Sequence, residues 1–466
     1  MTTRELAQLV VAGVSWEPGA GYASARPAIE RALSMGVGAY VLHGGDQDAV
    51  HTLTKELRQR SRVPPLIAAN MERGAGEKFL GATGLPPLAA IASLGDIEAV
   101  RRAARLTARE ARTIGVNWDL APVCDLDLDP ANPVTGSRAF GADPAQAATY
   151  AAAWIGACQA EGVLACAKHF PGRGRGCAAG PSGWPVISAT TDTLYETDLV
   201  PFRAAIEAGV ASLMTAHVAY PALDASGAPA TLSREILHWL LRQRLKFDGL
   251  VVSDGTGAGG DVVAAVRAGC DLVLAPTDVD GAVTALEEAK RGRGLDDERI
   301  HQSLRRRLKW AQWASPPNAY RKPSLADAAW GLQLAERTVH VVRGHVPVLA
   351  PPVDVVVIDG LGAPFIDALV GADRWDVRVV ERPGSDVMSP VVVALFGDSD
   401  AGRAAVGAAC RQAADAGRAA VVVQFAHPRV TAELAEMTPL AAAVVSAWDG
   451  ERSMQQAAAK WLRRQR

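Results

Sequence analysis

The chain of 466 residues has a formal net charge of -2, with 49% hydrophobic and 21% charged residues. A balanced charge gives no basic surface for nucleic acid or for an anionic membrane, so neither partner is expected. The N-terminus lacks the long apolar region of a signal peptide and no run of about 18 apolar residues occurs, which predicts a cytoplasmic protein.

Eight short apolar runs alternate with longer amphipathic stretches in the first two thirds of the chain. Runs that are apolar throughout are typical of strands buried on both faces, and the stretches between them have helical periodicity. Eight such units predict an α/β fold with a (β/α)8 TIM barrel, whose site lies at the carboxyl ends of the strands. The predicted strands are 9–16, 36–44, 64–72, 115–125, 162–171, 209–218, 247–255 and 269–276.

A second, smaller α/β unit follows. Its strands alternate with helices, which predicts an open, mostly parallel sheet. We therefore expect a barrel domain over 1–315, a linker over 316–336 and the smaller domain over 337–466. The strand candidates of this domain are 338–344, 353–360, 376–382, 390–398, 418–428 and 442–448.

Charged and polar side chains stand at the ends of several predicted barrel strands. Such groups converge at one face of a barrel and favour a polyhydroxylated small molecule as ligand. The six cysteines are scattered and no metal-binding motif is present, so neither a metal nor a cofactor is expected. The residues at strand ends are Glu17, His43, Glu72, Asp125, Lys168, His169, His217 and Asp254.

Five motifs occur in order along the barrel: "NWDLAPVCDLDLDPANPVTGSRAFGADP", "KHFPGRG", "SLMTAHVAYPAL", "PATLSREIL" and "FDGLVVSDG". In this order they resemble glycoside hydrolase family 3, and most closely its β-N-acetylglucosaminidase (β-N-acetylhexosaminidase) branch. The resemblance covers the whole barrel and, more weakly, the second domain. It implies a retaining cleavage of a β-glycosidic bond, in which a carboxylate attacks the sugar and a second group protonates the leaving oxygen.

The resemblance assigns the nucleophile to Asp254 of "VVSDG". A charged group at the end of a buried strand is costly unless it has a role or a partner. The alternative is that this carboxylate caps the following helix.

The sugar-binding role falls on residues of four motifs, and some of them have a structural alternative. Asp125 serves equally well as a loop cap, and His217 as a buried core histidine. The substrate-binding candidates are Asn70, Arg138, Lys168, His169, Asp125, Met214 and His217. Asn70 stands where the family has an aspartate that grips sugar hydroxyls, and it keeps the hydrogen bond without the charge.

The loop after "KHFPG" departs from the family. The branch carries an Asp–His pair there as general acid and base, and the resemblance places Ala179 and Pro181 at these two positions. Neither side chain titrates, so the proton donor of the family is missing. Arg173 replaces a further histidine of this loop, and Arg175 follows it. Both arginines are either partners for an anionic leaving group or solvated loop charges.

Three functions remain open from the sequence. The first is a retaining β-glycosidase of the hexosaminidase kind that lacks the usual acid; the second is a family member that binds a sugar or a regulatory partner without catalysis. A glycoside phosphorylase or transferase is the third. The expected ligand is a small β-linked amino sugar or glucoside, and the sequence does not define an oligomeric state. Alternative proton sources are Glu17, His43, Asp46, Glu72, Asp398, Asp400, Asp449 and Glu451.

Overall fold

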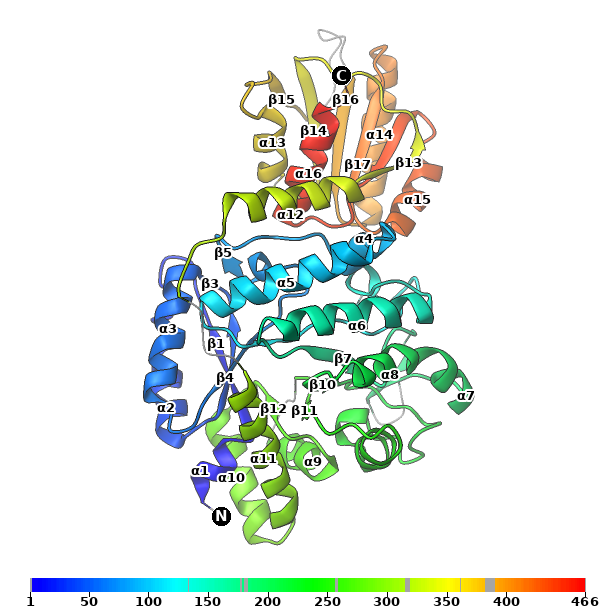
Figure 1. Ribbon diagram of the computed structural model, residues 1–466. Coiled ribbons are helices and arrows are strands. Elements are labelled where there is room, and N and C mark those ends of the chain that lie inside the picture. The colour runs from blue at the N-terminus through cyan, green and yellow to red at the C-terminus, as the bar shows by residue number, and fades with distance from the viewer. Residues whose placement is uncertain are drawn as a thin grey trace. The chain divides into compact units, whose positions relative to one another are not determined.

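The computed structural model describes residues 2–132, 134–176, 178–179, 183–255, 259–314, 319–360, 362–381 and 390–465 (Figure 1). The chain divides into two compact units. The first comprises Met1–Thr83 and Asp96–Ser324, and the second comprises Gly84–Gly95 and Leu325–Arg466. The predicted linker 316–336 therefore contains the start of the second unit, because helix α12 begins at Leu325.

The first unit is built on parallel strands. They form a five-stranded sheet in the order β12-β1-β2-β4-β6 and a three-stranded sheet in the order β11-β10-β7. Isolated parallel bridges link Trp118 to Leu164 and Val252 to Leu272, each joining one sheet to the other. The strands are β1 (Val10–Ser15), β2 (Ala39–His43), β4 (Leu66–Ala69), β6 (Trp118–Asp119), β7 (Cys166–Phe170), β10 (Ser212–Thr215), β11 (Leu250–Val252) and β12 (Val273–Leu274). Each lies inside one of the eight predicted ranges, which confirms the α/β class and the parallel pairing.

Helices connect these strands, and several begin at an aspartate whose carboxylate accepts a backbone N–H of the first turn. Asp46 caps α3, Asp96 caps α5 and Asp143 caps α6. In Figure 1, α5, α6 and α8 lie side by side, and they pack against one another in that order. The helices are α1 (Thr3–Ala7), α2 (Arg26–Met35), α3 (Gln47–Arg60), α5 (Ile97–Thr113), α6 (Pro144–Ala160), α7 (Thr191–Thr193), α8 (Val200–Glu207), α9 (Gly259–Ala268), α10 (Val279–Arg291) and α11 (Asp297–Trp313).

Several short elements decorate the strand ends. Two small strand pairs are β3 (Gly45–Asp46) with β5 (Phe79–Leu80), and β8 (Ala178–Ala179) with β9 (Pro185–Val186). The single-turn 3₁₀ helices are η1 (Ala75–Glu77), η2 (Gly136–Arg138) and η4 (Ala230–Leu232), and the π-helical segments are η3 (Leu194–Asp198) and η5 (Glu235–Arg244).

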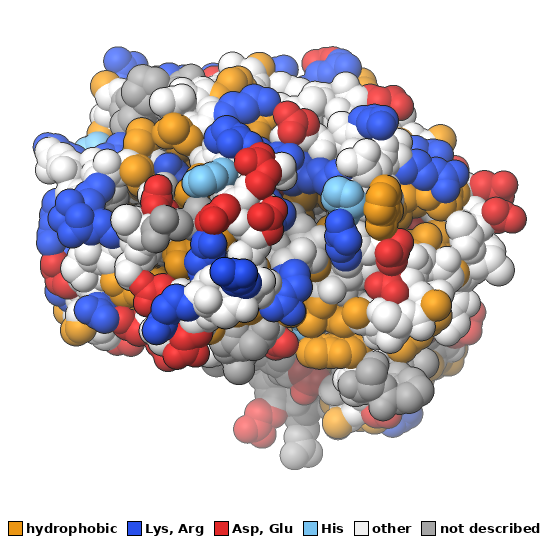
Figure 2. All heavy atoms as spheres, turned by 90° about the horizontal axis from the view of Figure 1, so that it is seen from below, with side chains coloured by type: hydrophobic (Ala, Val, Ile, Leu, Met, Phe, Trp, Pro, Cys, Tyr) orange, Lys and Arg blue, Asp and Glu red, His pale blue; other side chains and the backbone are white. Residues whose placement is uncertain are grey.

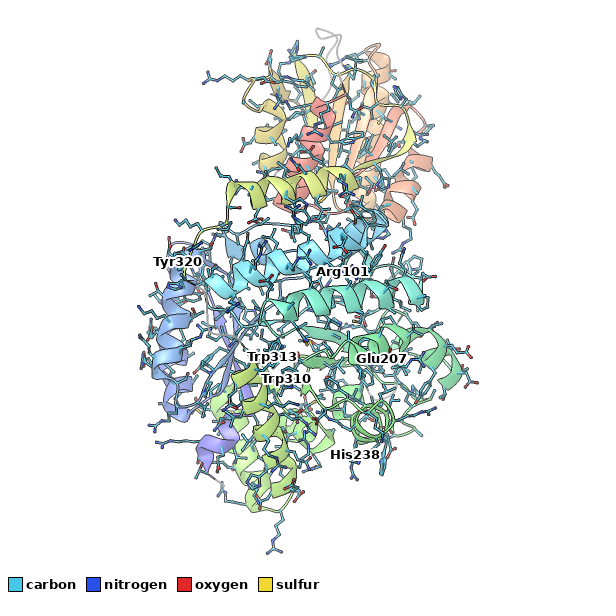
Figure 3. The ribbon with its side chains drawn as sticks, in the orientation of Figure 1. Arg101, Glu207, His238, Trp310, Trp313 and Tyr320 are labelled. Atoms are coloured by element: carbon cyan, nitrogen blue, oxygen red, sulfur yellow. The ribbon has the colours of Figure 1, made fainter. Side chains whose placement is uncertain are left out.

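One hydrophobic cluster occupies the interior of the first unit. All eight strands contribute to it or pack against it, and Trp118 of β6 donates a hydrogen bond of 2.8 Å to Ser212 Oγ of β10. Helix α11 meets the amino ends of the strands, where the buried Arg307 donates to the carbonyl oxygens of Gly38 and Pro64. Figure 3 labels Trp310 and Trp313 of the same helix, whose rings make an edge contact of 5.5 Å. Helix α11 thus covers the amino ends of strands such as β2 and β4, and their carboxyl ends lie on the opposite side of the sheet.

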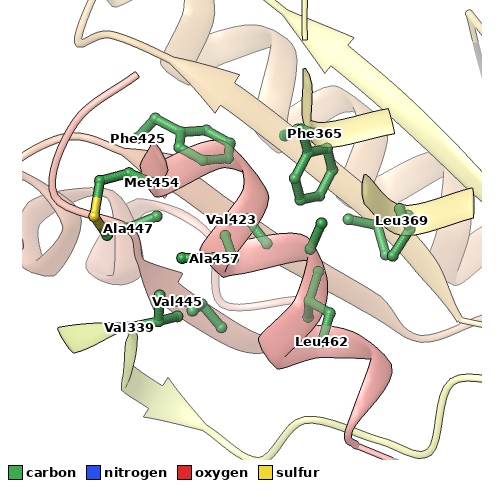
Figure 4. Close-up of a cluster of buried hydrophobic side chains, with 14 of the residues drawn as sticks. Val339, Phe365, Leu369, Val423, Phe425, Val445, Ala447, Met454, Ala457 and Leu462 are labelled. Carbon is green, nitrogen blue, oxygen red and sulfur yellow. The ribbon is translucent and has the colours of Figure 1, made fainter. Parts of the chain in front are cut away.

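The second unit is a six-stranded sheet in the order β13-β18-β17-β16-β14-β15, in which only β13 pairs antiparallel. Alternate side chains face two separate hydrophobic clusters, one of which Figure 4 shows with Phe365, Phe425 and Leu462. The strands are β13 (His340–Gly344), β14 (Val353–Ile358), β15 (Val377–Val379), β16 (Val391–Phe396), β17 (Ala420–Phe425) and β18 (Ala441–Ser446). The helices are α4 (Leu88–Ser93), α12 (Leu325–Thr338), α13 (Ala363–Val370), α14 (Asp400–Asp415), α15 (Pro428–Met437) and α16 (Arg452–Arg463).

The surface carries both charge signs. On the face shown in Figure 2, Lys and Arg side chains are interspersed with Asp and Glu. Among the described residues, no helix has the length and apolar character needed to span a bilayer.

Candidate active site

The carboxyl ends of β7, β10 and β11 bring three predicted motifs to one edge. In the register of these parallel strands, Met214 of β10 lies opposite Lys168 on one side and Val252 on the other. Asp254 stands two residues beyond Val252, so it extends past the same edge. The side chain of Met214 is buried in the interior cluster, which places it below the polar groups as packing.

Glu72 organises the most buried charges of this edge. Its carboxylate accepts two hydrogen bonds from Arg138, of 2.7 and 2.8 Å, and Lys168 Nζ lies 2.7 Å from Oε1. Lys168 Nζ also donates to Asn70 Oδ1 at 2.9 Å. Burial alone would raise the pKa of Glu72, but the two cations hold that pKa far below its usual range. One carboxylate thus holds two cations, and the group keeps one net positive charge.

A second buried pair lies next to it. His169 Nδ1 is 2.7 Å from Asp125 Oδ2, and the backbone N–H groups of His169 and Arg173 both donate to Asp125 Oδ1. Although burial opposes ionisation, the neighbouring His169 lowers the pKa of Asp125. Asp125 therefore fixes the imidazole and the start of the following loop together.

Arg173 reaches from this loop to the predicted nucleophile. Its Nη1 lies 3.2 Å from Asp254 Oδ2, and the two side chains are 22% and 27% exposed. Asp254 Oδ1 accepts the backbone N–H of Gly255, and the backbone N–H of Asp254 donates to Thr215 Oγ1. The carboxylate is thus open to solvent on part of its surface and bound to a guanidinium on another.

Arg175 plays a different part from Arg173. Its guanidinium donates to both oxygens of Asp198 and to Thr197 Oγ1, at 2.8 to 3.1 Å. Asp198 is buried at the end of η3. Arg175 therefore ties the loop to η3 instead of standing as a solvated charge, and of the two arginines it is Arg173 that pairs with Asp254.

The rest of the altered loop returns to the site through an aromatic contact. Ala179 lies in β8, where it pairs with Pro185, while Pro181 lies outside the described residues. Trp184 meets His217 edge-on, with ring centroids 4.6 Å apart. Burial lowers the pKa of His217, and the charge of Asp254 opposes this shift. His217 therefore lies within electrostatic reach of Asp254.

Four of the eight alternative proton sources form contacts of their own. Asp46 caps α3, and Glu72 is held by two cations. In the second unit, Asp398 and Asp400 both pair with Arg403.

The sequence of the first unit matches one known protein family over most of its length. The model of the family described as Glycosyl hydrolase family 3 N terminal domain matches residues 2–309. The chain belongs to glycoside hydrolase family 3. This confirms the family assigned from the ordered motifs.

Relatives within glycoside hydrolase family 3 point to one branch. A β-N-acetylglucosaminidase/β-glucosidase of Cellulomonas fimi is 37% identical over 282 residues, which are 56% of this chain and 49% of that protein. The chain thus spans about half the length of this relative. A β-hexosaminidase of Thiobacillus denitrificans is 38% identical over 245 residues, or 49% of this chain and 67% of the relative. The solved structure of a family 3 β-N-acetylglucosaminidase from Paenibacillus sp. has a TM-score of 0.85 and 25% identity, and the match covers 100% of this chain and 97% of that one.

Some residues near this edge are not distinguished by the sequence pattern. Glu72 stands out only as a strand-end group and an alternative proton source, and Trp184 lies in none of the five motifs. Asp119 was missed as well: it is fully buried at the end of β6, accepts the backbone N–H of Met71, and its Oδ2 has no hydrogen-bond partner among the described residues. Burial raises the pKa of Asp119 to about 8, against the opposing charge of Lys168.

Proposed function

We propose that this protein is a retaining β-glycosidase of the β-N-acetylhexosaminidase kind that uses Asp254 as its nucleophile. The observation that carries the proposal is a partly exposed carboxylate beside a buried set of sugar-binding donors. Lys168, His169 and Arg138 are each held in place by a buried carboxylate. Two curated relatives carry β-hexosaminidase or β-N-acetylglucosaminidase in their names, which favours an amino sugar as substrate.

A closed (β/α)8 barrel is part of this proposal. We infer that the eight strands close into a (β/α)8 barrel over residues 1–315, with 337–466 as the smaller domain. Two single bridges between the sheets and one shared interior cluster support closure. In such a barrel all the groups named above share the catalytic face.

The first chemical step forms a glycosyl-enzyme. An oxygen of Asp254 attacks the anomeric carbon, and the bond from that carbon to the leaving oxygen breaks with its electron pair on the oxygen. Oδ2 is bound to Arg173, so either Oδ1 attacks or the guanidinium moves away. Water then attacks the same carbon, releases the sugar with retained configuration and returns the carboxylate.

The chain lacks the usual group that would protonate the leaving oxygen in this step. Ala179 and Pro181 carry no titratable group where the family has its acid, and a positioned acid contributes about 10²–10⁴-fold. Substrates whose leaving group is stable as an anion do not need that proton. We therefore expect turnover to be strongly biased toward activated glycosides.

Two other functions are each favoured by one contact. The ion pair between Arg173 and Asp254 resembles a neutralised nucleophile, which favours a sugar-binding protein without catalysis. The same guanidinium, beside the attacking carboxylate, also suits an incoming phosphate, which favours a phosphorylase. Phosphate that leaves the rate and the products unchanged would eliminate the phosphorylase.

The test is intact-mass spectrometry after incubation with an activated 5-fluoro N-acetylglucosaminyl donor. The glucosyl analogue and the Asp254→Asn variant are run in parallel. We expect a mass gain of one sugar on the natural chain and none on the variant. A labelled variant would remove Asp254 from the mechanism, and no label from either donor despite measurable sugar binding would favour the non-catalytic protein.

A further inference from the structure

A large basic cleft lies at the amino ends of β11 and β12, the ends opposite to Asp254. It has a volume of about 1070 Å³ and is lined by η5, α9, the connection from α10 to α11, and α11 itself. Eight Lys and Arg side chains line it against two carboxylates. The formal charge of the whole chain is -2, so this concentration of positive charge is local.

The floor of the cleft is a fixed cluster of arginines. Asp271 is fully buried and accepts hydrogen bonds from Arg242, Arg299 and Arg306, at 2.6, 3.1 and 3.3 Å. Burial alone would raise the pKa of Asp271, but the three guanidinium groups lower it to about 2. One buried carboxylate thus orders three guanidinium groups, and Arg306 also pairs with Asp248 of the lining at 3.3 Å.

Two arginines at the rim of the cleft differ from those of the floor, because no buried carboxylate in the described part of the chain holds them. Arg234 and Arg293 are exposed, and neither forms an ion pair with another described residue. Arg293 stands between two glycines in the left-handed region, with φ of 56°. The left-handed conformation belongs to the C-terminal cap of α10, where the backbone N–H of Gly294 donates to the carbonyl oxygen of Ala289, and it sets Arg293 at the mouth of the cleft.

Further donors complete the lining. His238, labelled in Figure 3, lies on η5, and its pKa is lowered by burial and by the neighbouring Arg234 and Arg299. The exposed Trp239 packs edge-on against this imidazole, with centroids 4.8 Å apart. Together with this imidazole, the cleft offers the planar guanidinium groups described above, which match the geometry of phosphate oxygens.

We propose that this cleft binds a compact small molecule that carries a chain of phosphate groups. A neutral sugar would gain nothing from so many cations. A long polyanion would need a continuous basic track, and Asp248 and Asp296 stand among the cations of the lining. A short polyphosphate, free or attached to a nucleoside, places all its charges within the cleft.

The test is calorimetric titration of the full chain with inorganic tripolyphosphate and, separately, with ATP. The informative variant is Arg234→Gln with Arg293→Gln. Its matched control is Arg62→Gln with Arg291→Gln, because both of those arginines are exposed and lie outside the lining. We expect one saturable site on the natural chain and on the control, and an affinity at least about tenfold weaker in the rim variant.

Three results would overturn the proposal: no binding to the natural chain, equal weakening in both double variants, or binding that is not saturable at physiological ionic strength. Equal affinities for tripolyphosphate and ATP would identify the phosphate chain alone as the ligand, and a tighter ATP complex would add the nucleoside. The proposal stands apart from catalysis, since labelling of Asp254 is measured independently.

Discussion

At the scale of single residues, the contact between Arg173 and Asp254 decides how reactive the site is. The guanidinium occupies Oδ2 at 3.2 Å and competes with a sugar for that oxygen. We expect Arg173→Gln to accelerate formation of the glycosyl-enzyme from a neutral activated donor by about three- to tenfold, which corresponds to about 1 kcal/mol of lost ion pairing at a partly exposed site. Stopped incubation and intact-mass measurement give the rate.

Arg175→Gln is the matched control for this experiment. It removes a guanidinium two residues away that binds the buried Asp198 instead of the nucleophile. We expect the labelling rate to stay unchanged while the protein loses stability. A slower Arg173→Gln variant would mean that this arginine assists the reaction.

Asp119 supplies a pH prediction. Its pKa of about 8 in the folded chain compares with about 3.9 for an unfolded aspartate, so the folded state binds one proton more between these values. Stability from this group is therefore fully present in acid and falls as pH rises through that window, by at most about 1.4 kcal/mol per pH unit.

Asp119→Asn tests this slope. The amide oxygen can still accept the N–H of Met71, and it carries no proton to lose. We expect the free energy of unfolding of the variant to gain on the natural chain steadily from about pH 4 to pH 8. Urea titrations at several pH values measure the difference, and a constant offset would show that Asp119 does not titrate in this range.

The residues of the site differ in how visible they were in the sequence. Asp254, Lys168 and His169 stand in motifs, so their place at the strand ends was predictable. Glu72 was visible only as a charged strand end, because its partners Arg138 and Lys168 lie 66 and 96 positions away in the chain. Pairing over such separations depends on the register of strands, which no local pattern encodes.

At the scale of elements, the eight parallel strands of the first unit were predicted because buried parallel strands are apolar throughout. Their lengths were not: β6 spans only Trp118–Asp119 within a predicted range of 115–125. In that range Pro122 cannot donate to a ladder, and the chain beyond Asp119 turns to build the site. The small β8–β9 pair was also missed, since strands of two residues leave no periodicity.

The altered loop offers the prediction that belongs to this scale. Ala179 lies in β8 and pairs with Pro185, next to the Trp184 that contacts His217. If this pair carries the loop to the site, Ala179→Asp with Pro181→His restores the acid of the family. We expect kcat/KM for an alkyl glycoside to rise at least about tenfold, which is a part of the 10²–10⁴-fold that a well-positioned acid contributes.

An aryl glycoside with a good leaving group is the internal reference, because it needs little protonation and its kcat/KM should hardly change. Ala179→Asp alone is the control variant, since it adds the carboxylate without the histidine. A double variant with no gain on the alkyl substrate would show that the loop does not reach the leaving oxygen.

At the scale of the whole molecule, the two compact units do not correspond to two continuous segments of the sequence. Residues 84–95 lie between β4 and β6 of the first unit in the chain but belong to the second unit. There α4 packs against α12, and Ala89 and Ala90 are part of its buried cluster. A composition-based boundary cannot show this, because the helix is only six residues long and its partner lies more than 200 residues further on.

This arrangement predicts that a fragment of residues 325–466 is destabilised. It lacks α4, and the apolar surface that α4 covers on the second unit becomes exposed to water, at a cost of about 2 kcal/mol. For a unit of this size we expect the thermal midpoint of the fragment to lie about 4–8 °C below that of the same fragment with residues 84–95 joined to Leu325 by a flexible linker. The fusion carrying Ala90→Asp is the matched control, because a charge at a fully buried position prevents docking of the helix. Calorimetry of the three fragments decides the matter: equal midpoints would show that α4 contributes nothing to the second unit, whereas recovery in the fusion but not in the Ala90→Asp control would assign that stability to the packing of this one helix.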